Sequence, residues 1–227
     1  MIRAAATVVL LRQGEGGDPE VLLLERHPDR HVHGGGWVFP GGGVDPIDEA
    51  LAREEAGGEA DDEAIARQAA ARETEEEAGL RIEPSALRPL SRWITPEGLA
   101  RRYDARFFIA AAPPDPIRVD GEEIVGYRWL RPGDAIRARS AGELALSPPT
   151  FVTLVRLLRR PRIEASSPLP FFLPRICSVA QGLCALYPGD AGYESQRPEL
   201  EGSRHRLWIL PEGWRYEPPL ETPGSSD

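Results

Sequence analysis

Three glutamates at helical spacing are the residues of this sequence best suited to chemistry. Glu73, Glu76 and Glu77 stand at positions i, i+3 and i+4, so a helix would bring their carboxylates onto one face. Crowded carboxylates repel one another unless a cation joins them, and such oxygen ligands suit Mg²⁺ or Mn²⁺. Arg72 directly precedes them and is suited to orient one carboxylate through a forked ion pair. Taken alone, a charged run of this kind is typical of a solvated helix face.

The composition limits the chemistry that these carboxylates can serve. The chain has 227 residues, of which 41% are hydrophobic and 28% charged, which is ordinary for a globular protein with a buried core. Its formal net charge of −9 argues against long nucleic acid as a partner, although bound metal would still allow a small anionic substrate. The sequence contains no lysine, which excludes a Schiff-base lysine and a lysine-dependent phosphate loop.

The remaining global features predict a cytoplasmic protein. Cys177 and Cys184 are too few for a disulfide framework or a zinc site. No window of 18 apolar residues occurs, and the N-terminus lacks a charged and then apolar leader. We therefore expect no membrane partner.

The elements expected around the glutamates are helices and the strands of a mixed sheet. The stretch 48–80 is rich in alanine and glutamate, and it predicts a helix interrupted at the glycine pair 57–58, with Asp61 or Asp62 capping the second part. The segment 31–43 contains six glycines and predicts a loop or a very tight, turn-rich segment. Strands and helices do not alternate regularly, which favours a mixed sheet flanked by helices over a doubly wound parallel sheet. The other expected elements are strands at 4–11, 20–25, 88–95, 103–112 and 123–130 and short helices at 132–140 and 149–160.

The glycine run before the helix, taken together with the helix, resembles the Nudix box. In that family the box reads Gly, five residues, Glu, seven residues, then Arg-Glu-aliphatic-x-Glu-Glu-x-Gly-aliphatic, and it forms a loop–helix–loop that binds metal and diphosphate. Gly43 and Glu49 match the first spacing. The second half matches at Arg72, Glu73, Glu76, Glu77, Gly79 and Leu80.

The box departs from the family pattern at two places. Between Glu49 and the second half lie 22 residues instead of seven, which indicates an insertion of about 15 residues, roughly 53–67. Thr74 stands where an aliphatic residue is usual. The insertion leaves the metal-binding half intact, but it leaves open whether Glu49, Asp45 or Asp48 serves as the first acid of the box.

The interrupted box and its surroundings are similar to one branch of the family. Residues 93–96 (WITP) and 102–108 (RYDARFF) extend a resemblance to the branch that includes the peroxisomal coenzyme A diphosphatases of animals and many bacterial relatives. This resemblance implies an α/β/α sandwich with a mixed sheet. We expect a Nudix hydrolase domain at 1–160, a C-terminal extension at 161–217 packed on it, and a disordered tail at 218–227. Three roles for the extension stay open: completing the domain, covering the active site, or forming a homodimer interface.

The function that the resemblance implies is metal-dependent hydrolysis of a diphosphate linkage. The favoured substrate is coenzyme A or an acyl-coenzyme A, as a small-molecule nucleoside diphosphate derivative. The alternatives are ADP-ribose or a dinucleotide, a nucleoside triphosphate, and a Nudix module that senses a nucleotide without catalysis. The retained glutamates argue against the last of these.

The resemblance also implies roles for the box glutamates. Glu73, Glu76 and Glu77 would bind Mg²⁺ or Mn²⁺, and Glu77 or Glu76 would polarise the attacking water. Arg72 would hold one of these carboxylates in place. A general base on a downstream loop is an alternative, and the candidates there are Glu122 and Glu123.

The expected substrate-binding residues lie on the glycine run and on a later strand. Gly41, Gly42 and Gly43 would let the backbone approach both the helix and the phosphates. Arg102 and Arg106 are candidates for a substrate phosphate, and they would serve equally well as surface partners of nearby acids.

Overall fold

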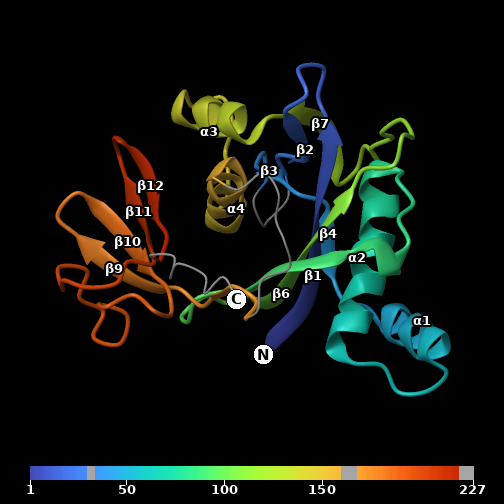
Figure 1. Ribbon diagram of the computed structural model, residues 1–227, viewed down its shortest axis with the longest axis horizontal. Helices are drawn as coiled ribbons and strands as arrows, with labels where there is room; N and C mark the ends of the chain where they lie inside the picture. The colour runs from blue at the N-terminus through green and yellow to red at the C-terminus, as the bar shows by residue number, and fades with distance from the viewer. Residues whose placement is uncertain (30–33, 160–167, 220–227) are drawn as a thin grey trace, which may run out of the picture.

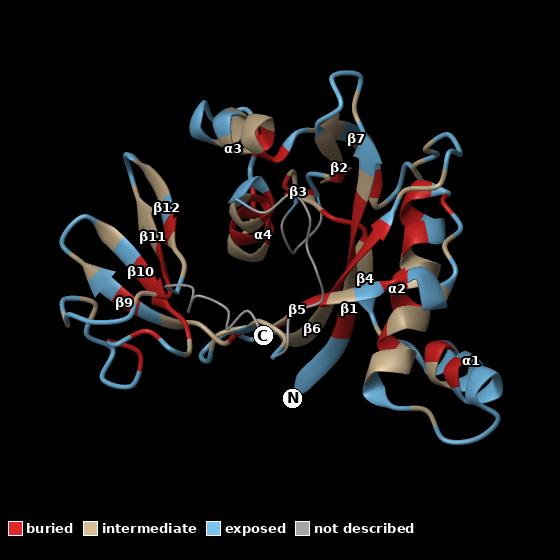
Figure 2. Ribbon diagram, in the orientation of Figure 1, coloured by how far each residue is buried: buried red, intermediate tan, exposed pale blue. Residues whose placement is uncertain are grey.

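Alternation of apolar residues along the first strand determines how the molecule is layered. In the computed structural model, which describes residues 1–29, 34–159 and 168–219, strand β1 spans Ile2–Gln13. Val8 and Leu10 pack in one core cluster with alanines of a helix, whereas Val9 packs in a second cluster on the opposite face. Because successive side chains of a strand point to opposite faces, both faces of this strand are buried. Figure 2 shows the buried residues gathered along these central strands.

The central sheet is mixed, as the sequence predicts. Within the described residues it has eight strands in the order β3-β2-β1-β6-β5-β8, with β4 paired to β1 and β7 to β2. Strand β1 runs parallel to β6 and β5 runs parallel to β8, while the other pairs are antiparallel. The other strands are β2 (Pro19–Arg26), β3 (Trp37–Val38), β4 (Gly41–Gly43), β5 (Arg88–Ile94), β6 (Arg102–Ala111), β7 (Ile124–Leu130) and β8 (Phe171–Phe172).

Helices cover both faces of this sheet, which confirms the predicted fold class (Figure 1). On one face lie α1 (Pro46–Ala56) and α2 (Asp62–Ala78), and a short 3₁₀ helix (Pro84–Ala86) follows. On the other face lie α3 (Pro132–Ser140) and α4 (Pro148–Arg159). No helix within the described ranges has both the length and the apolar character needed to cross a membrane.

The predicted interruption of the box helix lies between α1 and α2. Gly57 has φ +67° and ends α1 in the left-handed conformation that glycine adopts without steric cost. Asp61 caps α2, because its Oδ1 accepts a hydrogen bond from the Ala64 N–H at 2.8 Å. The insertion at 53–67 therefore extends the facing ends of two helices instead of adding a separate subdomain.

The sequence predicts a loop or a tight, turn-rich segment over 31–43, whereas its described part has a turn at 34–35 followed by the short strands β3 and β4. Gly41–Gly43 pairs antiparallel with Ala5–Thr7. A Cβ at Gly41 would collide with the Ala6 carbonyl, and its φ of +151° is one that other residues rarely adopt. Glycine is present here because the two backbones approach so closely.

The segment after α4 builds a second, antiparallel sheet. Its strands β9 to β12 follow one another as a meander, on the side of the central sheet away from α1 and α2 (Figure 1). Trp93 of β5 stacks on Phe172 with ring centroids 3.8 Å apart and meets Tyr187 edge-on at 5.8 Å. The predicted boundary at residue 160 and most of the predicted tail lie outside the described residues. The strands are β9 (Arg175–Val179), β10 (Gly182–Leu186), β11 (Arg206–Leu210) and β12 (Gly213–Glu217).

Candidate active site

The last two turns of α2 lie against the glycine strand β4. The Glu77 side chain is only 5% exposed, and its Oε2 accepts a hydrogen bond from the Gly41 N–H at 2.9 Å. The Glu73 carboxylate lies so close to Gly42 that a Cβ there would collide with it. The predicted close approach of the glycine run to the helix is therefore present, and it buries two of the three glutamates.

Glu76 has a different environment from its two neighbours. Its side chain is 57% exposed, against 16% for Glu73. It accepts a hydrogen bond at 2.9 Å from Arg72 Nη1, the nitrogen that also donates to Glu73. The three glutamates share one side of α2, as predicted, but only Glu73 and Glu77 are packed against β4.

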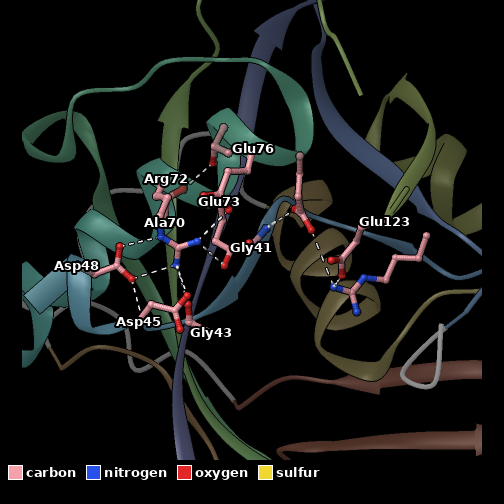
Figure 3. A network of polar contacts seen from close by, with 12 residues as sticks. Gly41, Gly43, Asp45, Asp48, Ala70, Arg72, Glu73, Glu76 and Glu123 are labelled. Atoms are coloured by element: carbon pink, nitrogen blue, oxygen red, sulfur yellow. Dashed lines mark hydrogen bonds and ion pairs between the residues drawn. The ribbon is translucent and has the colours of Figure 1, made fainter. Parts of the chain in front are cut away.

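Arg72 is the centre of a network that connects both halves of the box (Figure 3). Its Nε and Nη2 donate to the two carboxylate oxygens of Asp48 at 2.9 and 3.0 Å. Its Nη1 donates to Glu73 at 3.0 Å and to Glu76, and Nη2 also donates to the Gly43 carbonyl. The hydrogen bonds to Asp48, and then the charges of Glu73 and Asp48, raise the pKa of Arg72 above its ordinary value. Arg72 thus holds two carboxylates of α2 in position.

Asp48 takes the place that the family pattern gives to a glutamate. Its side chain is fully buried, and it accepts the Asp45 N–H at 2.8 Å in addition to the fork from Arg72. Glu49 is partly exposed and pairs with Arg53 one turn along α1. Of the three acids left open by the sequence, Asp48 is the one that binds Arg72 through both oxygens.

Thr74 is buried in α2, and its hydroxyl has a hydrogen-bond partner. Its Oγ1 donates to the Ala70 carbonyl at 2.7 Å. This bond to the preceding turn satisfies the polar group, so threonine packs where the family usually has an aliphatic residue.

Arg26 and Glu123 complete the site. Arg26 is the last residue of β2, and Glu123 directly precedes β7. Arg26 Nη2 lies 2.8 Å from Glu123 Oε1 and 3.9 Å from Glu77 Oε1. Glu123, one of the two candidate bases, lines the cleft, whereas Glu122 does not. Arg26 could not be predicted from the sequence, because its place beside α2 depends on the pairing of β2 with strands that are distant in the chain.

Burial disfavours the ionised forms of Glu73 and Glu77. Desolvation raises the pKa of Glu77 to about 8, although the Gly41 N–H and the Arg26 charge act in the opposite direction. Desolvation also raises the pKa of Glu73, and the charge of Glu123 adds to the shift at both glutamates. A cation near Glu73, Glu77 and Glu123 would relieve this repulsion. No three acidic, histidine or cysteine side chains of the described residues form a ready-made metal cage, so coordination by the glutamates stays a prediction.

A cleft of about 800 Å³ opens from these residues. Its wall includes Gly41–Gly43, Glu73 and Glu123 at one end. Further along, it runs between the central sheet and the C-terminal sheet, where Ala185 and Tyr187 contribute to the wall. The volume is within the usual range for a small-molecule site, roughly 300–1,000 Å³.

The two arginines predicted to bind phosphate lie elsewhere. Arg106 points to the other face of β6, where it lies 3.5 Å from Asp62 beside a separate cavity of about 450 Å³. Arg102 donates to a neighbouring main-chain carbonyl at 3.1 Å. Side chains alternate along β6, so Ala105 faces the cleft and Arg106 does not. The cleft instead has Arg101 in its lining, and the predicted substrate contacts of Arg102 and Arg106 do not fit this geometry.

The raised pKa of Glu77 predicts an unusual dependence of stability on pH. Between about pH 4.5 and 8, Glu77 is protonated in the folded chain and ionised in the unfolded chain, because its pKa rises from 4.5 to about 8 on folding. The folded state then binds more protons, so the contribution of Glu77 to stability is complete below pH 4.5 and is lost as the pH rises to about 8. We expect the melting temperature of the metal-free protein to fall across this range more steeply than that of a Glu77→Gln variant. Parallel slopes for the two proteins, measured in EDTA, would contradict the buried state of Glu77.

Comparison with known proteins agrees with the geometry. A family model described as the NUDIX domain matches residues 1–149. The acyl-coenzyme A diphosphatase NUDT19 of Homo sapiens is 34% identical over 128 residues, which cover 51% of this chain and 34% of that protein. The protein of the same name from Gallus gallus is 31% identical over 134 residues, covering 52% of this chain and 35% of that protein. The matched region thus spans about a third of the length of these relatives.

The overall fold is similar to that of a solved member of the family. The crystal structure of a NUDIX hydrolase from Alicyclobacillus acidocaldarius superimposes with a TM-score of 0.64 at 26% identity. The match covers 75% of this chain and 97% of that one. Both comparisons agree with the predicted Nudix hydrolase. With the NUDIX domain model matching well over half of its length, the chain belongs to the Nudix family.

Proposed function

We propose that this chain is a divalent-metal-dependent pyrophosphohydrolase that cleaves the diphosphate of coenzyme A or an acyl-coenzyme A. The observation that carries the proposal is the pair of carboxylates, buried Glu77 and partly buried Glu73, held against the glycine strand beside the cleft. Choice of substrate rests on the similarity to the proteins named acyl-coenzyme A diphosphatase over the matched half of the chain.

The donor set of the site suits Mg²⁺ or Mn²⁺. Its ligands would be carboxylate oxygens of Glu73, Glu76 and Glu77, with Glu123 as a further candidate from the cleft wall. When bound, the metal supplies the positive charge that neutralises a diphosphate. The glycine strand leaves space for phosphate oxygens beside these carboxylates, because no side chain projects from it.

The reaction is attack of water on one phosphorus of the diphosphate. A new P–O bond forms to the water oxygen as the bridging P–O bond breaks, so that each half of the substrate leaves with one phosphate. The water proton passes to a carboxylate, for which Glu77 is our choice and Glu123 the alternative. Arg72 acts through its ion pairs, by holding Glu73 and Glu76 toward the site.

Rates on four substrates test the proposal directly. We expect the purified protein with Mg²⁺ to cleave coenzyme A faster than ADP-ribose, NADH or dGTP, and to release two phosphorylated products. Excess EDTA should abolish turnover, and Mg²⁺ or Mn²⁺ should restore it. Fast ADP-ribose turnover without coenzyme A cleavage would overturn the choice of substrate. Undiminished activity in EDTA would overturn the metal dependence.

A further inference from the structure

The far end of the cleft is built by the C-terminal sheet. Residues after α4 contribute five positions to its wall, and the NUDIX domain match ends before all of them. The cleft that begins at the box glutamates therefore continues onto a segment outside the family domain. The five residues are Pro174, Ile176, Ala185, Tyr187 and Ile209.

The positions that the C-terminal sheet contributes to this end of the cleft are apolar apart from the Tyr187 hydroxyl, while the facing connection adds Thr95 and Arg101 to its apolar residues. Facing the C-terminal sheet, the connection between β5 and β6 contributes Pro96 and Leu99 to the same wall. Leu99 is 56% exposed and Ile176 is 41% exposed, so both present apolar surface that the described residues leave uncovered. Uncovered apolar side chains that line a shared cleft are typical of a ligand-binding surface.

Tyr187 adds one polar group to this apolar wall. The residue is fully buried among the rings of Trp93 and Phe172, and its hydroxyl has no hydrogen-bond partner within the described part of the chain. Burial raises the pKa of the phenol, so the hydroxyl keeps its proton. Buried tyrosine hydroxyls normally have a partner, and a carbonyl oxygen of a ligand would supply one.

We propose that the C-terminal half of the cleft binds the acyl-bearing arm of an acyl-coenzyme A, while the diphosphate lies at the box glutamates. This inference rests on the proposed function and adds the substrate group that the second sheet selects. An acyl arm is mostly apolar and carries carbonyl acceptors, which matches a wall of Ile176, Ile209 and Leu99 with the Tyr187 hydroxyl. A sugar or a phosphate bound against the C-terminal sheet would need several polar partners there, and its five cleft positions offer only the Tyr187 hydroxyl, since Thr95 and Arg101 belong to the facing connection.

Two changes test this inference: lengthening the acyl chain of the substrate, and introducing a charge into the cleft wall. With the native protein, kcat/KM should be higher for dodecanoyl-coenzyme A than for free coenzyme A, through a lower KM. In Ile176→Asp, the ratio of these two kcat/KM values should fall about tenfold, because an ionised side chain would oppose burial of the chain methylenes. Tyr187→Phe should lower the same ratio to a smaller extent.

Leu183→Asp is the matched control. Leu183 is on the adjacent strand β10, is 40% exposed against 41% for Ile176, and does not line the cleft. It therefore introduces the same charge at the same exposure in the same small sheet. We expect it to keep the native ratio, and a fall as large as that of Ile176→Asp would show a general effect on the sheet and overturn the inference.

The outcomes separate this inference from the proposed function. If coenzyme A is cleaved but KM does not depend on the acyl chain, the arm does not bind here and the proposed function stands. If Ile176→Asp changes KM for ADP-ribose as much as for the acyl substrate, a nucleoside occupies this end and the inference is wrong. If no diphosphate is cleaved, the proposed function fails. Calorimetry then tests the binding site without turnover, by comparing the affinities of the native and Ile176→Asp proteins for dodecanoyl-coenzyme A and coenzyme A. Weaker binding of dodecanoyl-coenzyme A alone in Ile176→Asp supports the inference, and unchanged binding of both ligands overturns it.

Discussion

Replacing Glu77 by glutamine is expected to lower kcat for diphosphate hydrolysis about 100- to 10,000-fold, the range typical of a lost acid–base carboxylate. Glutamine has the same shape but cannot ionise, so it can neither accept the water proton nor provide an anionic ligand. The side chain amide still offers an oxygen to the Gly41 N–H that Glu77 now accepts at 2.9 Å. Removing a buried charge whose pKa is raised should also leave the fold at least as stable near pH 8.

Glu75→Gln is the control for this variant. Glu75 is on the same helix, pairs with Arg81 and is 48% exposed, so the substitution removes the same charge outside the site. We expect native kcat for Glu75→Gln and native or higher melting temperatures for both variants at pH 8. Full activity of Glu77→Gln would show that the mechanism is wrong even though the fold is that of the family.

Replacing Asp48 by alanine is expected to reduce kcat/KM about 10- to 100-fold, the effect typical of losing a group that orients metal ligands. The Arg72 guanidinium would lose both of its contacts to the buried Asp48 carboxylate and would no longer hold Glu73 and Glu76 in register. Asp48→Asn, which keeps the size and one oxygen acceptor, should recover part of the loss. The apparent affinity for Mg²⁺ should fall more in Asp48→Ala than in Asp48→Asn, a change that simple destabilisation would not produce.

Glu49→Ala distinguishes the two acids of α1. Although Glu49 matches the spacing of the family box, its ion pair in the described part of the chain is with Arg53 near the surface, an interaction of the kind that contributes about 0–1 kcal/mol. Activity and Mg²⁺ dependence should therefore remain native. If Glu49→Ala were the damaging substitution and Asp48→Ala were silent, the role assigned to Asp48 would be wrong.

The prediction of a mixed sheet and of the box helix succeeds for local reasons. Helical spacing within α2 depends only on the helix repeat, so the common side of Glu73, Glu76 and Glu77 can be read from the chain. Gly57 and Asp61 mark helix ends through their own backbone and side-chain preferences. The strand pairing of Gly41–Gly43 was not predicted, because composition does not reveal that β1 approaches this segment closely enough to exclude a Cβ.

The sequence by itself therefore determined the family, the helix that carries the three glutamates and the mixed sheet on which it packs. Only the tertiary structure decided that Asp48 and not Glu49 binds Arg72, that Arg26 and Glu123 join the site, and that the second sheet forms the far wall of the cleft. The physical reason is distance along the chain. Helical periodicity relates neighbours, whereas these contacts join strands and helices tens of residues apart, and packing of both sheet faces brings them together.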